Sequence, residues 1–301
     1  MRFSLWASAS QSWPDLLDVA RLADSGGWHA LYLADHFMPR AATAADPGGP
    51  MLEATAALSA LAAATHRVRL AHLVLSMTYR HPAVLANWAA TTDQIANGRL
   101  TLGIGAGWQE NEHRAYGLAL GTPKERVDRF AEGLRAIRGL LGQTATTLSG
   151  EYYQLDGAVS EPKPVQEHMP VLIGASGPRM LSLVAQHGDE WNTWTKPGEF
   201  RTAAEPLDAA CERHGRDPKS VRRSTQAGIL VTDEPERARA FEADTRMPSA
   251  IAGTAQQIAE KAALWKDEGV DEIIIRDESL GRGQRRADAC AALWEALSQL
   301  R

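Results

Sequence analysis

The residues best suited to bind a ligand lie at the end of an apolar segment, 100–108. An alternating strand pattern of Leu and Ile runs there into a glycine at every second position and then Trp108. Glycine has no Cβ, so backbone can come within contact distance of a ligand, and tryptophan adds a flat face. The spacing differs from the Gly-x-Gly-x-x-Gly turn of dinucleotide-binding folds. We expect Gly105, Ala106, Gly107 and Trp108 to contact a planar cofactor. The alternative is a bend that only turns the chain.

Two ionisable residues, Asp35 and His36, follow the apolar segment 29–34. Histidine can donate or accept a proton near neutral pH, and a neighbouring carboxylate can shift the pKa of its imidazole. We expect His36 to transfer protons and Asp35 to position His36 or the cofactor ring. The alternative is a loop role in which both side chains bond to backbone groups.

A third group of candidates follows the apolar segment 68–75. Leu73 and Val74 would pack against the face of a flat ring, and Ser76 and Thr78 would meet its polar edge. Each comes at the end of a predicted strand, as do Asp35 and His36.

A fourth candidate segment, 174–179, reads Gly-Ala-Ser-Gly-Pro-Arg. Ser176 and Gly177 are predicted at a helix N-cap, with Pro178 in the first turn, so that free amides point outward. Such a helix start binds anions, phosphate above all. The alternative is an ordinary capped helix.

Several other chemistries lack their sequence signatures. There is no His-Glu-x-x-His, no cysteine cluster, no Gly-x-Ser-x-Gly and no Gly-Lys-Ser/Thr phosphate loop. We therefore expect no metal site, and a cofactor that supplies the difficult chemistry.

The elements that would position these residues alternate between short apolar strands and helices. Eight such units predict an α/β fold, a (β/α)8 TIM barrel, whose active sites lie at the carboxyl ends of its strands. A doubly wound sheet also alternates but suits this count less well. We expect one domain, 1–301, with insertions in βα loops and a hairpin-like insertion around 141–160. The predicted strands are 3–7, 29–34, 68–75, 100–105, 170–174, 190–193, 223–231 and 272–276.

The composition is that of a globular protein without membrane spans. The 301 residues are 44% hydrophobic and carry a net charge of -5, which argues against nucleic acid as a partner. The first residues show no signal-peptide pattern, so a cytoplasmic location is expected. Cys211 and Cys290 are predicted as separate buried apolar residues.

Four segments, 34–37, 79–82, 102–108 and 174–178, together resemble the luciferase-like monooxygenase superfamily, in particular its coenzyme F420 branch. The resemblance implies a barrel that binds F420, or FMN in other branches, with a non-proline cis peptide near Leu73–Val74. It places Asp35 and His36 beside the ring and substrate, and the phosphate-bearing tail near 105–107 and 176–178. The expected cofactor-binding residues are Leu73, Val74, Ser76, Gly105, Ala106, Gly107, Trp108, Asn111, Ala175, Ser176, Gly177 and Pro178.

Two departures from the family bear on the substrate. The sugar-phosphate dehydrogenases of this branch carry tryptophan where this chain has Arg40, and glutamate where it has Trp108. A glucose-6-phosphate dehydrogenase role is therefore not expected.

The sequence predicts an F420-dependent oxidoreductase that transfers a hydride between the deazaflavin C5 and a small organic substrate. Two alternatives stay open, an FMN-dependent monooxygenase that works with a separate reductase and a non-catalytic flavin- or F420-binding protein. The family resemblance implies a homodimer formed through barrel helices, and the loop 37–50 is a candidate lid.

Overall fold

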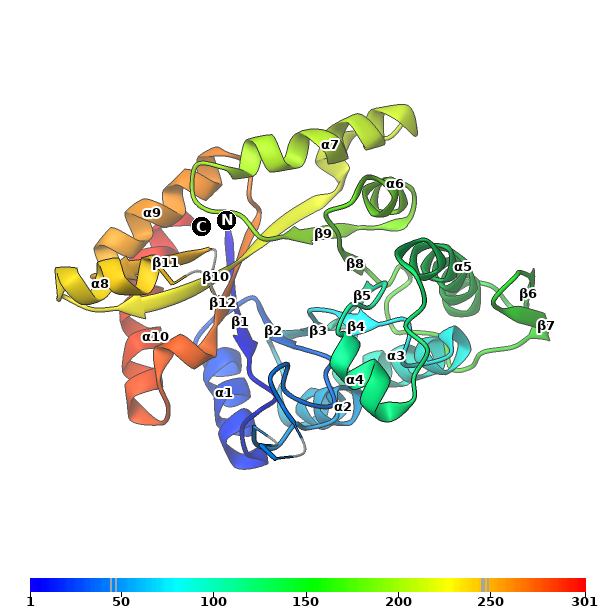
Figure 1. Cartoon of the computed structure of the whole chain (residues 1–301), viewed down its shortest axis with the longest axis horizontal. Helices are drawn as coiled ribbons and strands as arrows, with labels where there is room; N and C mark the ends of the chain where they lie inside the picture. Colours follow the sequence, from blue (N-terminus) through cyan, green and yellow to red (C-terminus); the bar gives the residue numbers. More distant parts are fainter. Residues whose placement is uncertain (44, 47, 245–246, 248) are drawn as a thin grey trace. The chain divides into compact units, whose positions relative to one another are not determined.

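The strands form the barrel that the sequence predicts. The computed structural model describes residues 1–43, 45–46, 48–244, 247 and 249–301 (Figure 1). The sheet order is β12-β1-β2-β3-β5-β8-β9, and β10 pairs with both β9 and β12, so the strands close into a (β/α)8 barrel. The barrel strands are β1 (Arg2–Ala7), β2 (Ala30–Leu33), β3 (Arg69–His72), β5 (Leu100–Gly105), β8 (Val171–Gly174), β9 (Glu190–Thr193), β10 (Arg222–Val231) and β12 (Glu272–Arg276).

The helices begin at the signals that their sequences carry. Ser12 caps α1 through the Asp15 amide, and Thr122 forms a capping box with Glu125 at the start of α5. The helices are α1 (Trp13–Ser25), α2 (Ala54–Ala64), α3 (Pro82–Ala96), α4 (Glu110–Tyr116), α5 (Pro123–Gly142), α6 (Pro178–His187), α7 (Phe200–Arg213), α8 (Pro235–Glu242), α9 (Ala255–Asp267) and α10 (Gln284–Leu297). In the described part of the chain, none is both long and apolar enough to cross a membrane.

The chain divides into two compact units. The first comprises residues 1–8, 12–32 and 175–301, and it buries Phe3, Trp191, Phe200 and Trp265. The predicted burial of the two cysteines is confirmed, since Cys211 and Cys290 are free and buried in this unit.

Close to the start of β12, the first unit buries a carboxyl group, that of Glu272. Ser4 Oγ and Tyr32 OH donate to its Oε1 at 2.5 and 2.9 Å. Burial, together with the charge of Glu190, raises the pKa of Glu272 to about 7. The unit therefore holds a titratable group whose ionisation opposes folding.

The second unit comprises residues 9–11 and 33–174 and contains β3, β5, β8 and helices α2 to α5. The predicted hairpin is present as an antiparallel pair, β6 (Thr146–Ser149) and β7 (Gln154–Ala158). Glu132 of α5 accepts hydrogen bonds from three consecutive amides, those of residues 151–153, and so anchors the turn of the hairpin.

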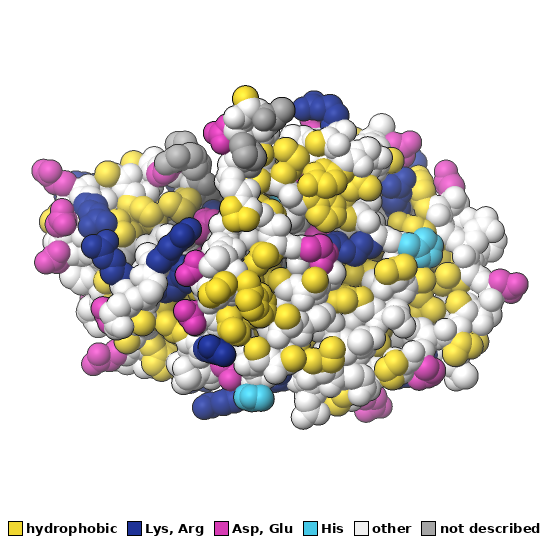
Figure 2. Space-filling view, turned by 90° about the horizontal axis from the view of Figure 1, so that it is seen from below, with side chains coloured by type: hydrophobic (Ala, Val, Ile, Leu, Met, Phe, Trp, Pro, Cys, Tyr) yellow, Lys and Arg dark blue, Asp and Glu magenta, His cyan; other side chains and the backbone are white. Residues whose placement is uncertain are grey.

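The structure differs from the predicted elements at three places. The predicted strand 68–75 is broken into β3 and the short β4 (Leu75–Ser76), with a cis peptide between Leu73 and Val74, which confirms the expected bond. Helix α4 and strand β11 (Ala250–Gly253) were not predicted. On the face in Figure 2, basic side chains are interspersed with acidic ones, and hydrophobic side chains gather in several patches.

Candidate active site

The candidate site in the second unit begins where β2 ends, at Asp35. The Asp35 carboxylate, 3% exposed, accepts a hydrogen bond from the Ser76 amide at 2.8 Å. Arg80 donates to both carboxylate oxygens, at 2.7 and 3.0 Å, and also to Glu53 at 2.5 Å. Asp35 therefore ties the end of β2 to the segment after β3. It is not the carboxylate that bonds to His36.

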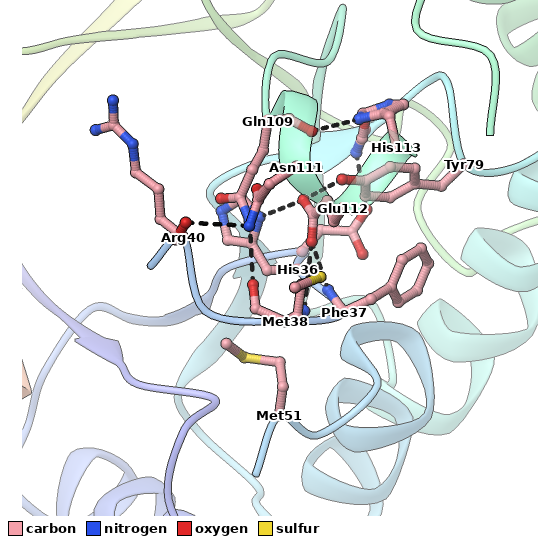
Figure 3. A network of polar contacts seen from close by, with 12 residues as sticks. His36, Phe37, Met38, Arg40, Met51, Tyr79, Gln109, Asn111, Glu112 and His113 are labelled. Atoms are coloured by element: carbon pink, nitrogen blue, oxygen red, sulfur yellow. Dashed lines mark hydrogen bonds and ion pairs between the residues drawn. The ribbon is translucent and has the colours of Figure 1, made fainter. Parts of the chain in front are cut away.

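The partner of His36 is Glu112, which the sequence did not single out. Nδ1 of His36 lies 2.8 Å from Oε1 of Glu112, and the hydroxyl of Tyr79 donates to the same oxygen. The amide of Phe37 donates to the other oxygen, Oε2, at 2.8 Å. Figure 3 shows these groups converging on the Glu112 carboxylate. The Glu112 side chain is fully buried, whereas that of His36 is 23% exposed.

These contacts keep Glu112 ionised. Burial alone would raise its pKa, but hydrogen bonds from His36, Tyr79 and the Phe37 amide outweigh that effect and hold the pKa below its ordinary value. Burial and the bond to Glu112 raise the pKa of Tyr79, so its hydroxyl keeps its proton. A carboxylate only accepts, so His36 Nδ1 must carry a proton, and Nε2 is left for other chemistry.

The glycine strand end lies in close contact with the segment that follows β3. A Cβ at Gly105 would lie 2.7 Å from Cγ2 of Val74. Gly107 has a φ of +86°, and a Cβ there would lie 2.6 Å from Oγ1 of Thr78 and 2.7 Å from Oγ of Ser76. Glycine is therefore required at both positions, because a side chain would displace the residues that follow β3.

A chain of short hydrogen bonds lies against Gly107. Ser76 Oγ and Thr78 Oγ1 are 2.7 Å apart, and Thr78 Oγ1 lies 2.6 Å from Nε2 of His113. Nδ1 of the buried His113 donates to the Gln109 carbonyl at 2.6 Å. These bonds fix the hydroxyl groups next to the glycine backbone.

Trp108 and Arg40 lie beside His36. The Trp108 ring is 54% exposed and meets the His36 ring edge-on, with centroids 5.5 Å apart. The Arg40 guanidinium carbon lies 5.5 Å from the Trp108 centroid. Asn111 donates to the carbonyls of Pro39 and Arg40, at 3.3 and 3.0 Å. Asn111 thus holds the start of the candidate lid 37–50, of which residues 44 and 47 lie outside the described residues.

The fourth candidate segment belongs to the first unit. The N-cap of α6 is Gly177 alone, not Ser176 and Gly177 together, because Pro178 occupies the first helical position. No side chain caps this helix start. The Ala175 amide donates to the Asn192 carbonyl at 3.3 Å. Ser176, Gly177 and Pro178 are exposed, which leaves this helix start open to an anion.

Most predicted site residues thus gather within the second unit. These are Asp35, His36, Leu73, Val74, Ser76, Gly105, Ala106, Gly107, Trp108 and Asn111. Ala175, Ser176, Gly177 and Pro178 follow β8 in the first unit. Within the described ranges, no group of three or more His, Cys, Asp or Glu side chains is arranged to hold a metal.

Comparison with known proteins defines the class. The profile of the luciferase-like monooxygenase family matches residues 1–247. The chain belongs to this family and is an oxidoreductase of the luciferase-like type.

Two individual relatives match most of the chain. The chain is 34% identical over 260 residues to an F420-dependent glucose-6-phosphate dehydrogenase of Beutenbergia cavernae, covering 85% of this chain and 75% of that one. It is 28% identical to an uncharacterized protein of Mycobacterium tuberculosis, over 93% of this chain and 91% of that one.

Solved structures share the fold. An F420-dependent secondary alcohol dehydrogenase superposes with a TM-score of 0.87 at 20% identity, over 100% of this chain and 99% of that one. A long-chain alkane monooxygenase superposes with a TM-score of 0.83 at 14% identity, over 100% and 91%.

Proposed function

We propose that this protein is an F420-dependent oxidoreductase that transfers a hydride between the deazaflavin C5 and a small organic substrate. The observation that carries the proposal is His36, whose imidazole is fixed through Nδ1 by a buried, ionised Glu112. The relatives and the structural neighbour named as F420-dependent support the choice of cofactor.

The residues present fit a planar cofactor with a phosphate. The backbone of Gly105 and Gly107, which carries no Cβ, would form a cradle beside Val74, Ser76 and Thr78. Within the second unit, Leu73, Val74 and Ser76 would back the ring. In the first unit, the exposed first turn of α6 has free amides that suit a phosphate. When bound, the deazaflavin supplies the carbon that accepts or donates the hydride.

The chain itself would move the proton. With Nδ1–H held by Glu112, Nε2 of a neutral His36 carries the lone pair that takes a proton from a substrate hydroxyl as the adjacent carbon loses its hydride. The imidazolium that results is stabilised by the Glu112 carboxylate. In the reverse direction, Nε2–H returns the proton to the carbonyl oxygen as the carbon gains a hydride.

An FMN-dependent monooxygenase is the second candidate. It is favoured by the family itself and by the structural likeness to the alkane monooxygenase. Both cofactors carry a planar ring and a phosphate, so the same residues would hold either one.

The proton-transfer role is tested with His36→Gln. We expect kcat to fall by about 100- to 10,000-fold, the usual contribution of one positioned acid–base group. Cofactor affinity, measured separately by fluorescence titration, should stay near the wild-type value. Wild-type turnover in a variant that binds cofactor would contradict the role of His36.

A further inference from the structure

Arg40 is a cation near the proposed proton-transfer group, His36. Among the residues that the structure describes, it forms no ion pair, and its close side-chain neighbour is the Trp108 ring. Figure 3 shows its guanidinium extended away from the Glu112 carboxylate. Glu112 is occupied by His36 and Tyr79. The guanidinium donors of Arg40 are therefore available to a ligand.

The backbone beneath Arg40 is held in place. Three consecutive carbonyls, those of residues 38, 39 and 40, accept hydrogen bonds from the side chains that follow Trp108. Gln109 donates to the first at 3.0 Å, and Asn111 donates to the other two. A surface arginine on an unrestrained loop would have no such support. The arrangement fixes Arg40 and Trp108 relative to each other and to His36.

We propose that Arg40 and Trp108 select a substrate with an aromatic or conjugated ring and an oxyanion, a carboxylate or a phosphate. The planar guanidinium matches two oxygens of such a group, and the exposed Trp108 ring offers a face for stacking. This inference rests on the proposed function, because it places the reacting carbon of the substrate at His36.

The geometry limits the size of the substrate. The guanidinium carbon lies 5.5 Å from the Trp108 centroid, which lies 5.5 Å from the His36 centroid. The guanidinium carbon therefore lies within about 11 Å of the His36 ring centroid, a separation that one substituted ring can span.

The test compares benzoate with benzamide, which share a ring but differ in charge, and adds phenyl phosphate as a second oxyanion. Affinities are measured by quenching of tryptophan fluorescence in the protein without cofactor and again with F420 added. We expect benzoate or phenyl phosphate to bind about three- to tenfold more tightly than benzamide, as for a partly exposed charge pair. The stronger of the two identifies the oxyanion.

Arg40→Met should abolish this discrimination while the affinity for benzamide stays unchanged, and Arg40→Lys should restore part of it. Arg114→Met, which removes an exposed arginine of α4, is the matched control and should keep the discrimination. Equal binding of benzamide and both anions to the wild type would overturn the proposal. So would a loss of the preference for the anion in Arg114→Met as large as that in Arg40→Met. Failure of F420 to bind would instead contradict the proposed function. The comparison of the anions with benzamide would still test the role of Arg40, because it is also made without cofactor.

Discussion

Replacing Glu112 by glutamine tests how the site controls His36. Glutamine keeps the size of the side chain but has one acceptor oxygen and one donor group in place of two acceptors. The Phe37 amide needs an acceptor at 2.8 Å, so the glutamine oxygen is expected to face it. The NH2 group then faces His36 and Tyr79. Nδ1 of His36 would have to become an acceptor, which moves its proton to Nε2.

The size of the effect follows from the bond that is lost. A hydrogen bond to a charged group contributes about 1.5–3 kcal/mol. In the variant, the tautomer of His36 with its proton on Nδ1, which leaves Nε2 free to react, must form without this bond. Since about 1.4 kcal/mol corresponds to a factor of ten, kcat should fall roughly 10- to 150-fold. Cofactor affinity should change little, because the hydrogen bonds of Glu112 go to His36, Tyr79 and the amides of residues 37 and 38.

Two measurements check this reasoning. Steady-state turnover gives kcat, and nitrogen NMR of the imidazole reports which ring nitrogen of His36 carries the proton. Glu110→Gln, two residues earlier and on the exposed side of α4, is the control and should leave both unchanged. If Glu112→Gln retained the wild-type rate and a protonated Nδ1, the proposed positioning by Glu112 would be refuted.

Two further predictions concern buried charge and the glycine strand end. The pKa of Glu272 is raised to about 7, so the folded protein holds this proton more tightly than the unfolded chain does. The stabilisation that this provides is complete below about pH 4.5 and is lost as the pH rises through about 7. Glu272→Gln should remove up to about 3 kcal/mol of that loss when denaturant unfolding is compared at pH 5 and pH 8, and an unchanged pH dependence would show that ionisation of Glu272 does not cause the loss. Gly107→Ala, strained by its positive φ and by contacts with Ser76 and Thr78, should weaken cofactor binding at least tenfold and lower the unfolding midpoint, and wild-type affinity would disprove the cradle.

The barrel and the glycine strand end could be predicted because their signals are local. Apolar strands alternate with helices whose capping residues lie within a few positions. The change from Leu and Ile to Gly in 100–107 coincides with the end of β5. The cis peptide at Leu73–Val74 was predicted from family resemblance, since no feature of those two side chains requires it.

The partner of His36 could not be predicted in this way. Glu112 lies 76 positions further along the chain, on a seven-residue helix with too few apolar residues to show a helical period. A carboxylate is costly to bury, so the sequence gives no reason to expect Glu112 in the interior. The hydrogen bonds that Tyr79 and the Phe37 amide donate to it explain its burial. Asp35, which adjoins His36, was the obvious candidate, but Arg80 and the Ser76 amide occupy its carboxylate.

The central claim is the identity of the cofactor, and it is tested most directly by titrating the purified protein with F420 and with FMN in parallel. Quenching of the exposed Trp108, with Trp108→Phe as the control for its signal, reports binding beside His36. The account predicts saturation by F420 at micromolar concentration and a much weaker response to FMN. A preference for FMN would make the protein an oxygen-using flavoprotein, and binding of neither would contradict the assignment of the glycine strand end as a cofactor site.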